Sequence, residues 1–221
     1  MSPDPSATVV LLRGGPSALE LLLLRRSSKL VFHGGAWVFP GGRIDPEDYA
    51  GGAEHDVDAA SRNGAVRETR EETSLCVDPL DLVPISHWTT PEGLPRRFST
   101  WFYVAAAGEG QVKVDGGEIQ AHRWMRPRDA LAAQRAGEIE LPPPTFVTIS
   151  ALSAYGSSQA ALSSLREREP EIFFPRVRRV TGGACSLYEG DAGYAESDPE
   201  RPGARHRLWI LETGWRYERS S

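Results

Sequence analysis

The residues best suited to chemistry lie in the stretch AVRETREETSL, residues 65–75. Glu68, Glu71 and Glu72 stand at positions i, i+3 and i+4, which share one face of an α-helix. Like charges at this spacing destabilise a helix by roughly 0.2–0.5 kcal/mol per pair. The pattern has two interpretations: a solvated acidic face, softened by Arg67 and Arg70, or a binding site for a divalent cation.

A turn that precedes the acidic stretch favours the cation site. Mg²⁺ and Mn²⁺ prefer oxygen ligands, and Mg²⁺ is commonly shared between a few carboxylates and the phosphates of a substrate. The turn FPGG, residues 39–42, carries little side-chain bulk and can therefore approach a helix or a ligand closely. The sequence thus predicts a metal site built from a loop and a helix.

Together these residues resemble the box of the Nudix hydrolase family, G-x5-E-x7-R-E-U-x-E-E-x-G-U, in which U is aliphatic. Gly42 matches the first glycine, and the R-E-x-x-E-E part is intact from Arg67 to Glu72. Asp48 stands in place of the first Glu, and eighteen residues, 49–66, separate it from Arg67 instead of seven. Thr69 and Ser74 replace the aliphatic residue and the later glycine.

The resemblance implies metal-dependent hydrolysis of a diphosphate linkage. The implied ligands of Mg²⁺ or Mn²⁺ are Glu68, Glu71 and Glu72. Arg67 would orient a glutamate through a bidentate ion pair, and Gly41 and Gly42 would support the loop and offer a backbone ligand. Bound metal would neutralise phosphate oxygens and lower the pKa of a water, from which a carboxylate takes a proton.

Two residues are candidates for that general base, Glu68 and Glu118. Glu118 follows a Gly-Gly pair and precedes a predicted strand in VDGGEIQAHRW, residues 114–124. An exposed acid at the end of a strand is the alternative interpretation of Glu118, and the choice between the two candidates stays open.

The segment LLLLRRSSKLVFHGGAWVFPGG, residues 21–42, resembles in part the signature of the coenzyme A diphosphatase branch. Arg26 and Gly35 match that signature, whereas Val31 replaces its second Arg. Over roughly residues 6–155 the chain is also similar to the subgroup of the peroxisomal acyl-coenzyme A diphosphatases. The resemblance makes Arg26, Arg96 and Arg97 candidate substrate contacts, although the last two also fit an ordinary charged start of a strand.

The leading prediction is therefore a hydrolase of a nucleoside diphosphate derivative, with coenzyme A or acyl-coenzyme A first. ADP-ribose, dinucleoside polyphosphates and NADH are alternative substrates. A Nudix module that senses a ligand without catalysis, or a structural protein with a solvated acidic helix, are alternatives of a different class.

The elements that must position these residues follow from periodicity and turn composition. Strands are predicted at 7–13, 18–26, 36–42, 82–90, 98–107, 118–125, 172–180, 184–190 and 206–218. Helices are predicted at 58–73, 126–138 and, as one or two helices, 145–169, with a mobile stretch at 190–206. This order predicts an α/β (α+β) fold. The resemblance implies a Nudix-type α/β/α sandwich with a mixed sheet, residues 1–155, and a C-terminal helical and β-hairpin extension, 156–221, packed on it.

Net charge, apolar runs and cysteine content limit the partners and the cellular location that we expect. The chain has 221 residues and a net charge of −5, which argues against nucleic acid as the main partner. No apolar run approaches 18 residues, so no membrane span is expected. The two cysteines lie far apart and the N-terminal residues lack a signal-peptide pattern, so a reducing cytoplasm is expected. A homodimer is left open.

Overall fold

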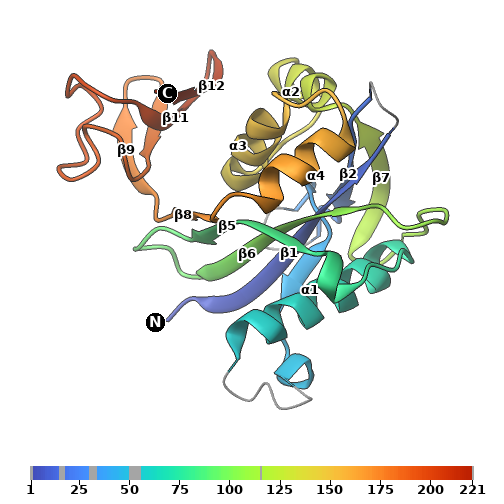
Figure 1. The fold of residues 1–221 in the computed structure, drawn as a ribbon. Helices are drawn as coiled ribbons and strands as arrows, with labels where there is room; N and C mark the ends of the chain where they lie inside the picture. Colours follow the sequence, from blue (N-terminus) through green and yellow to red (C-terminus); the bar gives the residue numbers. More distant parts are fainter. Residues whose placement is uncertain (1, 15–17, 30–33, 50–55, 115, 221) are drawn as a thin grey trace.

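The computed structural model describes residues 2–14, 18–29, 34–49, 56–114 and 116–220. A mixed β-sheet lies between helix α1 (Val57–Thr73) on one face and three helices on the other (Figure 1). Those three helices are α2 (Pro127–Arg135), α3 (Pro143–Leu152) and α4 (Ser158–Arg166). The α/β/α sandwich with a mixed sheet is thus confirmed. Residues 15–17, between the predicted strands at 7–13 and 18–26, and residues 50–55, between Asp48 and Arg67, lie outside the described residues.

The sheet contains eight strands within the described residues, in the order β3-β2-β1-β6-β5-β8, with β4 paired to β1 and β7 to β2. The strands are β1 (Asp4–Arg13), β2 (Glu20–Arg26), β3 (Trp37–Val38), β4 (Gly41–Arg43), β5 (Val83–Thr89), β6 (Phe98–Ala106), β7 (Ile119–Met125) and β8 (Glu171–Phe173). β1 with β6 and β5 with β8 are parallel pairs, and the other pairs are antiparallel.

The central strand β1 has apolar residues on both faces because both faces are covered. Val10 and Leu12 pack toward α2, α3 and α4, whereas Val9 and Leu11 pack toward α1 with Ala65 of that helix. The acidic helix is therefore held against the centre of the sheet by its apolar side, and its carboxylates are left at the edge of that contact.

Helix α1 begins and ends near the predicted residues. Asp56 caps its start, accepting a hydrogen bond from the Ala59 N–H at 3.1 Å. Thr69, which replaces the aliphatic residue of the box, is fully buried, and its hydroxyl donates to the Ala65 carbonyl at 2.7 Å. Ser74 ends the helix in the left-handed conformation with φ 61°, at the position where the family box has glycine.

Two short 3-10 helices flank α1, at Pro46–Tyr49 and Pro79–Asp81. The first lies between the predicted strand at 36–42 and the predicted helix at 58–73, where no element was expected, and it contains the buried residue Asp48. Through Asp48 this short helix contacts Arg67 of α1.

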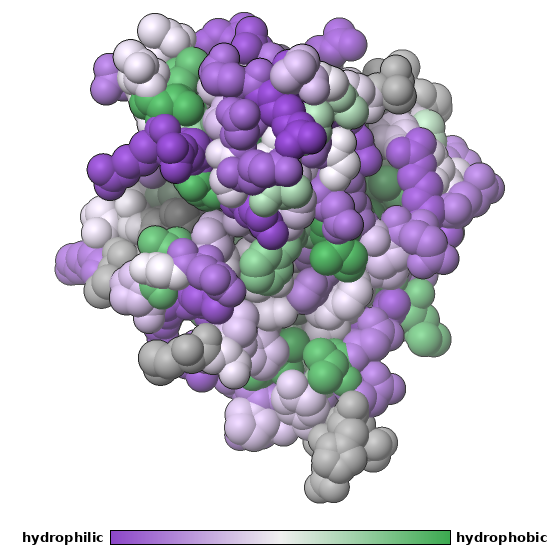
Figure 2. Space-filling view, turned by 90° about the vertical axis from the view of Figure 1, so that its left-hand side faces the viewer, coloured by the Kyte–Doolittle hydropathy of each residue, from purple (hydrophilic) through white to green (hydrophobic). Residues whose placement is uncertain are grey.

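After α4 the chain adds β8 to the main sheet and then forms a separate antiparallel sheet in the order β12-β11-β10-β9. Its strands are β9 (Arg176–Val180), β10 (Gly183–Leu187), β11 (His206–Leu211) and β12 (Gly214–Arg219). The predicted extension is confirmed, as a four-stranded sheet rather than a single hairpin. Figure 2 views the molecule from the side of this sheet, where hydrophobic areas are small and separated by hydrophilic ones.

The segment 190–206, predicted to be mobile, instead forms consecutive turns around a buried ion pair. Asp191 accepts hydrogen bonds from Nε and Nη2 of Arg207 at 2.7 and 2.6 Å, and from the backbone N–H groups of Gly193 and His206 at 2.8 Å. The polar residues of this segment, whose composition predicted mobility, instead supply hydrogen-bond partners to the buried Asp191–Arg207 pair. In the described residues, no helix has the length and apolar character needed to cross a bilayer.

We predict that Ser74→Gly stabilises the protein by about 0.5–1 kcal/mol, because glycine adopts the left-handed conformation without the strain of a Cβ atom. Urea unfolding followed by circular dichroism measures the difference. Ser74→Ala keeps the Cβ and should give no gain. A loss of stability in Ser74→Gly would show that the cap is not strained.

Candidate active site

Arg67 is the centre of the site, and all five N–H groups of its guanidinium are engaged. Nε and Nη2 donate to the two carboxylate oxygens of Asp48 at 3.0 and 2.9 Å. Nη1 donates to Glu68 at 3.0 Å and to Glu71 at 3.2 Å, and Nη2 also donates to the Arg43 carbonyl at 3.0 Å. The hydrogen bond to Asp48 is the largest effect that raises the pKa of Arg67 above its ordinary value.

Asp48 is the residue whose role the sequence understated. Its side chain is only 5% exposed, and it also accepts a hydrogen bond from the Asp45 N–H at 2.8 Å. Asp48 therefore joins the first 3-10 helix to α1 through a bidentate pair with Arg67. The box position of Asp48 was the available signal, because an acid occupies that place in the family pattern despite the longer insertion that follows.

Glu72 lies buried between α1 and the β4 loop. Its carboxylate accepts a hydrogen bond from the Gly41 N–H at 2.9 Å, the one hydrogen bond to this side chain from the described residues. Burial raises the pKa of Glu72 to about 8, against the opposing effect of the Gly41 N–H. The charged form of Glu72 is thus poorly solvated by the protein alone.

Glu68 lies on the same side of the helix, directly against the turn. A Cβ atom at Gly42 would stand 2.3 Å from the Glu68 Oε1 atom, so only glycine permits this approach. Burial raises the pKa of Glu68, while the neighbouring Arg67 charge lowers it. The Gly41-Gly42 pair therefore contacts two carboxylates, one through its N–H and one through the space that the missing side chain leaves.

Arg26 and Glu118 approach this pair of acids from the far end of β2 and from the residue before β7. Their charges act on Glu72: Glu118 raises its pKa and Arg26 lowers it, after the larger effect of Glu68. The Nε atom of Arg26 is buried and has no hydrogen-bond partner among the described residues. The structure thus brings Arg26 and Glu118, which lie 92 positions apart in the numbering, to the acidic helix.

The other predicted residues lie farther out. The Glu71 side chain is 58% exposed and contacts Arg67 from the solvent side. Arg97 donates from Nε to the Thr90 carbonyl at 3.0 Å and so closes the β5–β6 turn, while Arg96 lies over the Phe98 ring at 5.7 Å. No contact joins Arg96 or Arg97 to the acids of α1 within the described residues, and their predicted role as substrate contacts stays a prediction.

The chemistry of the donors fits a divalent cation. Glu68 and Glu72 present carboxylate oxygens, which Mg²⁺ and Mn²⁺ prefer, and burial leaves Glu72 in need of a positive charge. In the part of the chain that the structure describes, no three His, Cys, Asp or Glu side chains are gathered so that they could hold a metal ion by themselves. Mg²⁺ commonly completes its coordination with water and substrate phosphates, so two or three carboxylates beside a phosphate site suffice.

Fold and site together define an α/β/α protein that presents buried carboxylates next to a glycine turn and an arginine whose buried Nε atom has no hydrogen-bond partner among the described residues. Residues 2–143 match the sequence profile of the NUDIX domain. The chain therefore belongs to the Nudix family, whose members typically use divalent metal ions.

Three curated relatives are similar to this chain. The acyl-coenzyme A diphosphatase NUDT19 of Xenopus laevis is 22% identical over 287 residues, covering 87% of this chain and 75% of that protein. The putative nudix hydrolase 7 of Caenorhabditis elegans is 26% identical, covering 61% of this chain and 56% of that protein. The NUDT19 protein of Gallus gallus is 31% identical, covering 54% of this chain and 34% of that protein. The chain thus spans about half or less of two of these relatives.

Solved structures agree on the fold. A NUDIX hydrolase from Alicyclobacillus acidocaldarius is 27% identical with a TM-score of 0.66, covering 76% of this chain and 99% of that one. The NUDIX domain of NrtR from Shewanella oneidensis, solved with ADP ribose, is 18% identical with a TM-score of 0.51, covering 68% and 86%, and shows a similar fold.

We predict that Asp48→Asn lowers the free energy of unfolding by about 2–3 kcal/mol, because it breaks a buried, bidentate ion pair with Arg67. Asp45→Asn is the matched control. Asp45 contacts the same guanidinium at 3.4 Å, but its side chain is 47% exposed, so its loss should cost less than about 0.5 kcal/mol. Equal losses in the two variants, measured by urea unfolding, would refute a special role for Asp48.

Proposed function

We propose that this protein hydrolyses the diphosphate linkage of a nucleoside diphosphate derivative, with coenzyme A or an acyl-coenzyme A as the first substrate class. The observation that carries the proposal is the buried Glu72 carboxylate, held by the Gly41 N–H beside Glu68 and Arg26. Burying a charged carboxylate costs free energy, and a bound cation would offset that cost.

The resemblance and these contacts together suggest the roles. Glu68, Glu71 and Glu72 would hold Mg²⁺ or Mn²⁺, while Arg67 positions Glu68 and Glu71 and Asp48 anchors Arg67. The metal supplies neutralisation of phosphate oxygens and a water of lowered pKa. The buried, unpartnered Nε of Arg26 offers a donor to a phosphate oxygen, which an arginine binds well.

The proton of the attacking water needs a carboxylate acceptor, and Glu68 and Glu118 are the two candidates. Glu118 acts on Glu72 from the strand side, and Glu68 lies on the helix beside it. Glu68 is held by Arg67 through a hydrogen bond at 3.0 Å. Both Glu68 and Glu118 stay candidates for the proposed base.

The choice of substrate class rests on the partial coenzyme A signature and on similarity to relatives named acyl-coenzyme A diphosphatases. ADP-ribose is the second candidate, because the NrtR domain was solved with that ligand. Both substrates contain a nucleoside diphosphate, which is the chemistry that the acidic helix and Arg26 would recognise. A sensing module, which binds such a ligand without cleaving it, is the alternative from another class.

Incubation of the protein with coenzyme A and Mg²⁺ or Mn²⁺ tests the proposal. We expect 4′-phosphopantetheine and adenosine 3′,5′-bisphosphate as products, detected by mass spectrometry, and no turnover when EDTA removes the metal. ADP-ribose, NADH and dinucleoside polyphosphates form the comparison panel. Binding of a diphosphate without turnover of any of them would favour the sensing module.

Glu72→Gln should lower kcat/KM by on the order of 10²–10³-fold, because a neutral amide is a far weaker metal ligand. The free energy of unfolding should stay within about 1 kcal/mol of wild type, since Gln can still accept the Gly41 N–H and the change relieves repulsion from Glu68. Glu109→Gln, which changes an exposed glutamate outside the site, is the control. Retained activity in Glu72→Gln together with a large loss of stability would reverse the assignment.

A further inference from the structure

A second feature with the form of a ligand site lies on the other side of the sheet from α1. It is a cavity of about 880 Å³ between β5, helices α3 and α4, and the C-terminal strands β8 and β12. Pockets that hold small molecules typically measure roughly 300–1,000 Å³. Apart from the residues of β5, all of its lining lies beyond residue 143, where the match to the NUDIX domain ends.

The cavity is separate from the acidic cluster. Trp88 of its floor belongs to the apolar cluster that faces α2, α3 and α4, whereas Ala65 of α1 belongs to the opposite one. The strand ladder from Trp88 crosses β6 and β1 before it reaches Arg43 in β4. Three inter-strand steps correspond to roughly 14 Å, so a ligand in the cavity need not touch the carboxylates of α1.

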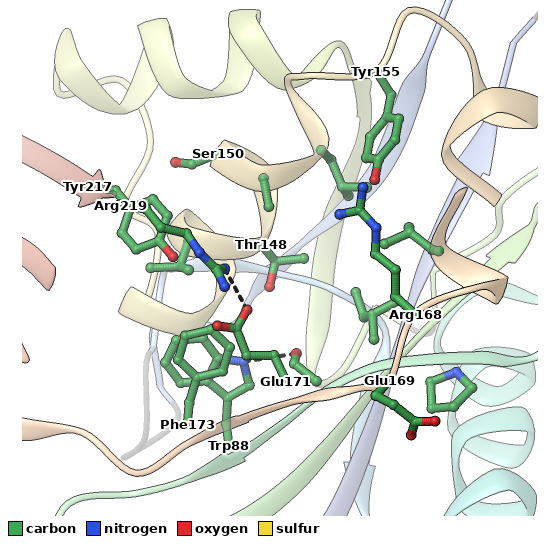
Figure 3. A pocket seen from close by; sticks show the side chains of 17 residues that line it. Trp88, Thr148, Ser150, Tyr155, Arg168, Glu169, Glu171, Phe173, Tyr217 and Arg219 are labelled. Carbon is green, nitrogen blue, oxygen red and sulfur yellow. Dashed lines mark hydrogen bonds and ion pairs between the residues drawn. The ribbon is translucent and has the colours of Figure 1, made fainter. Parts of the chain in front are cut away.

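The floor of the cavity is apolar. Trp88 and Phe173 stack with ring centroids 3.8 Å apart and an interplanar angle of 2°. Val147 and Leu152, both buried, come from α3 and also line the cavity. Figure 3 shows the stacked rings at the base of the cavity, below Thr148. Such a surface favours a hydrocarbon or aromatic ligand body.

The two arginines that line the cavity differ, because one has an acidic partner and the other has none in the described part of the chain. Arg219 is paired with Glu171 at 2.7 Å on one side. On the opposite side, the Arg168 guanidinium points into the cavity beside Tyr155, while the Glu169 carboxylate points away from it (Figure 3). Among the described residues, the Arg168 side chain has no ion pair and no hydrogen bond. One positive charge therefore faces the cavity without a counter-charge.

We propose that this cavity binds a small amphipathic carboxylate, with its apolar body on the Trp88–Phe173 floor and its carboxylate on Arg168. A planar guanidinium pairs with a carboxylate through two parallel hydrogen bonds, which suits a single arginine at the mouth. A neutral apolar ligand leaves Arg168 without a partner, and a cationic ligand is repelled by it. The site is an additional one, and it does not depend on the hydrolase reaction proposed for the acidic helix.

Isothermal titration calorimetry with decanoate, below the concentration at which it aggregates, tests the proposal. Wild-type protein should bind decanoate saturably, and decylammonium should bind on the order of tenfold more weakly or not at all. Arg168→Gln should weaken decanoate binding by on the order of tenfold, because the charge is removed. Arg166→Gln, which changes a neighbouring arginine at the end of α4 outside the cavity lining, should bind like wild type.

A second variant tests the cavity itself. Ala151 lines the cavity but is exposed, so Ala151→Trp fills the space without disturbing the buried core and should abolish binding. Glu72→Gln should bind decanoate as wild type does, which separates this site from the acidic helix. The proposal is overturned by the absence of saturable binding to wild type, by equal affinity in Arg168→Gln, by equal affinity for decylammonium, or by loss of binding in Glu72→Gln.

Discussion

The bidentate ion pair between Arg67 and Asp48 is the constraint on which the candidate site depends. Asp48 is buried in a short 3-10 helix, and Arg67 is the residue through which that helix, the β4 strand and α1 are joined. A guanidinium with all five N–H groups engaged cannot move without breaking several charge-assisted hydrogen bonds. Because two of those bonds go to Glu68 and Glu71, the same fixed arginine sets where the acids of α1 can stand.

The neighbouring acid Glu72 is buried and only partly compensated. Glu72 gains one N–H donor from Gly41 and the charge of Arg26, and neither fully replaces water. The raised pKa of Glu72 reflects this incomplete solvation of its charged form. A divalent cation next to Glu68 and Glu72 would remove it, and the phosphates of a substrate would complete the coordination of the ion. Arg67 thus holds the acids of α1 in place, and Glu72 lacks a positive charge that a bound cation would supply.

Much of this could be predicted from the sequence. Apolar runs and turn residues predicted the strands and helices of the main sandwich, whereas the metal site inferred from the i, i+3, i+4 acids stays a prediction. The sequence did not predict Asp48 as the anchor of Arg67, because an Asp in place of Glu and a spacing of eighteen residues instead of seven looked like a weakened motif. The resemblance made Arg26 and Glu118 candidates, but the β2–β7 pairing that brings the two together is not visible in the sequence. The order of segment 190–206 depends on one long-range pair, Asp191 with Arg207, which composition does not reveal.

The most direct test is anomalous X-ray diffraction from a crystal soaked in Mn²⁺. Our account predicts a manganese peak within coordination distance, about 2.0–2.3 Å, of a Glu72 carboxylate oxygen, with Glu68 turned toward the same ion and the Arg67–Asp48 pair unchanged. A crystal that shows no anomalous peak at α1, with Glu68 and Glu72 turned away from each other, would contradict it.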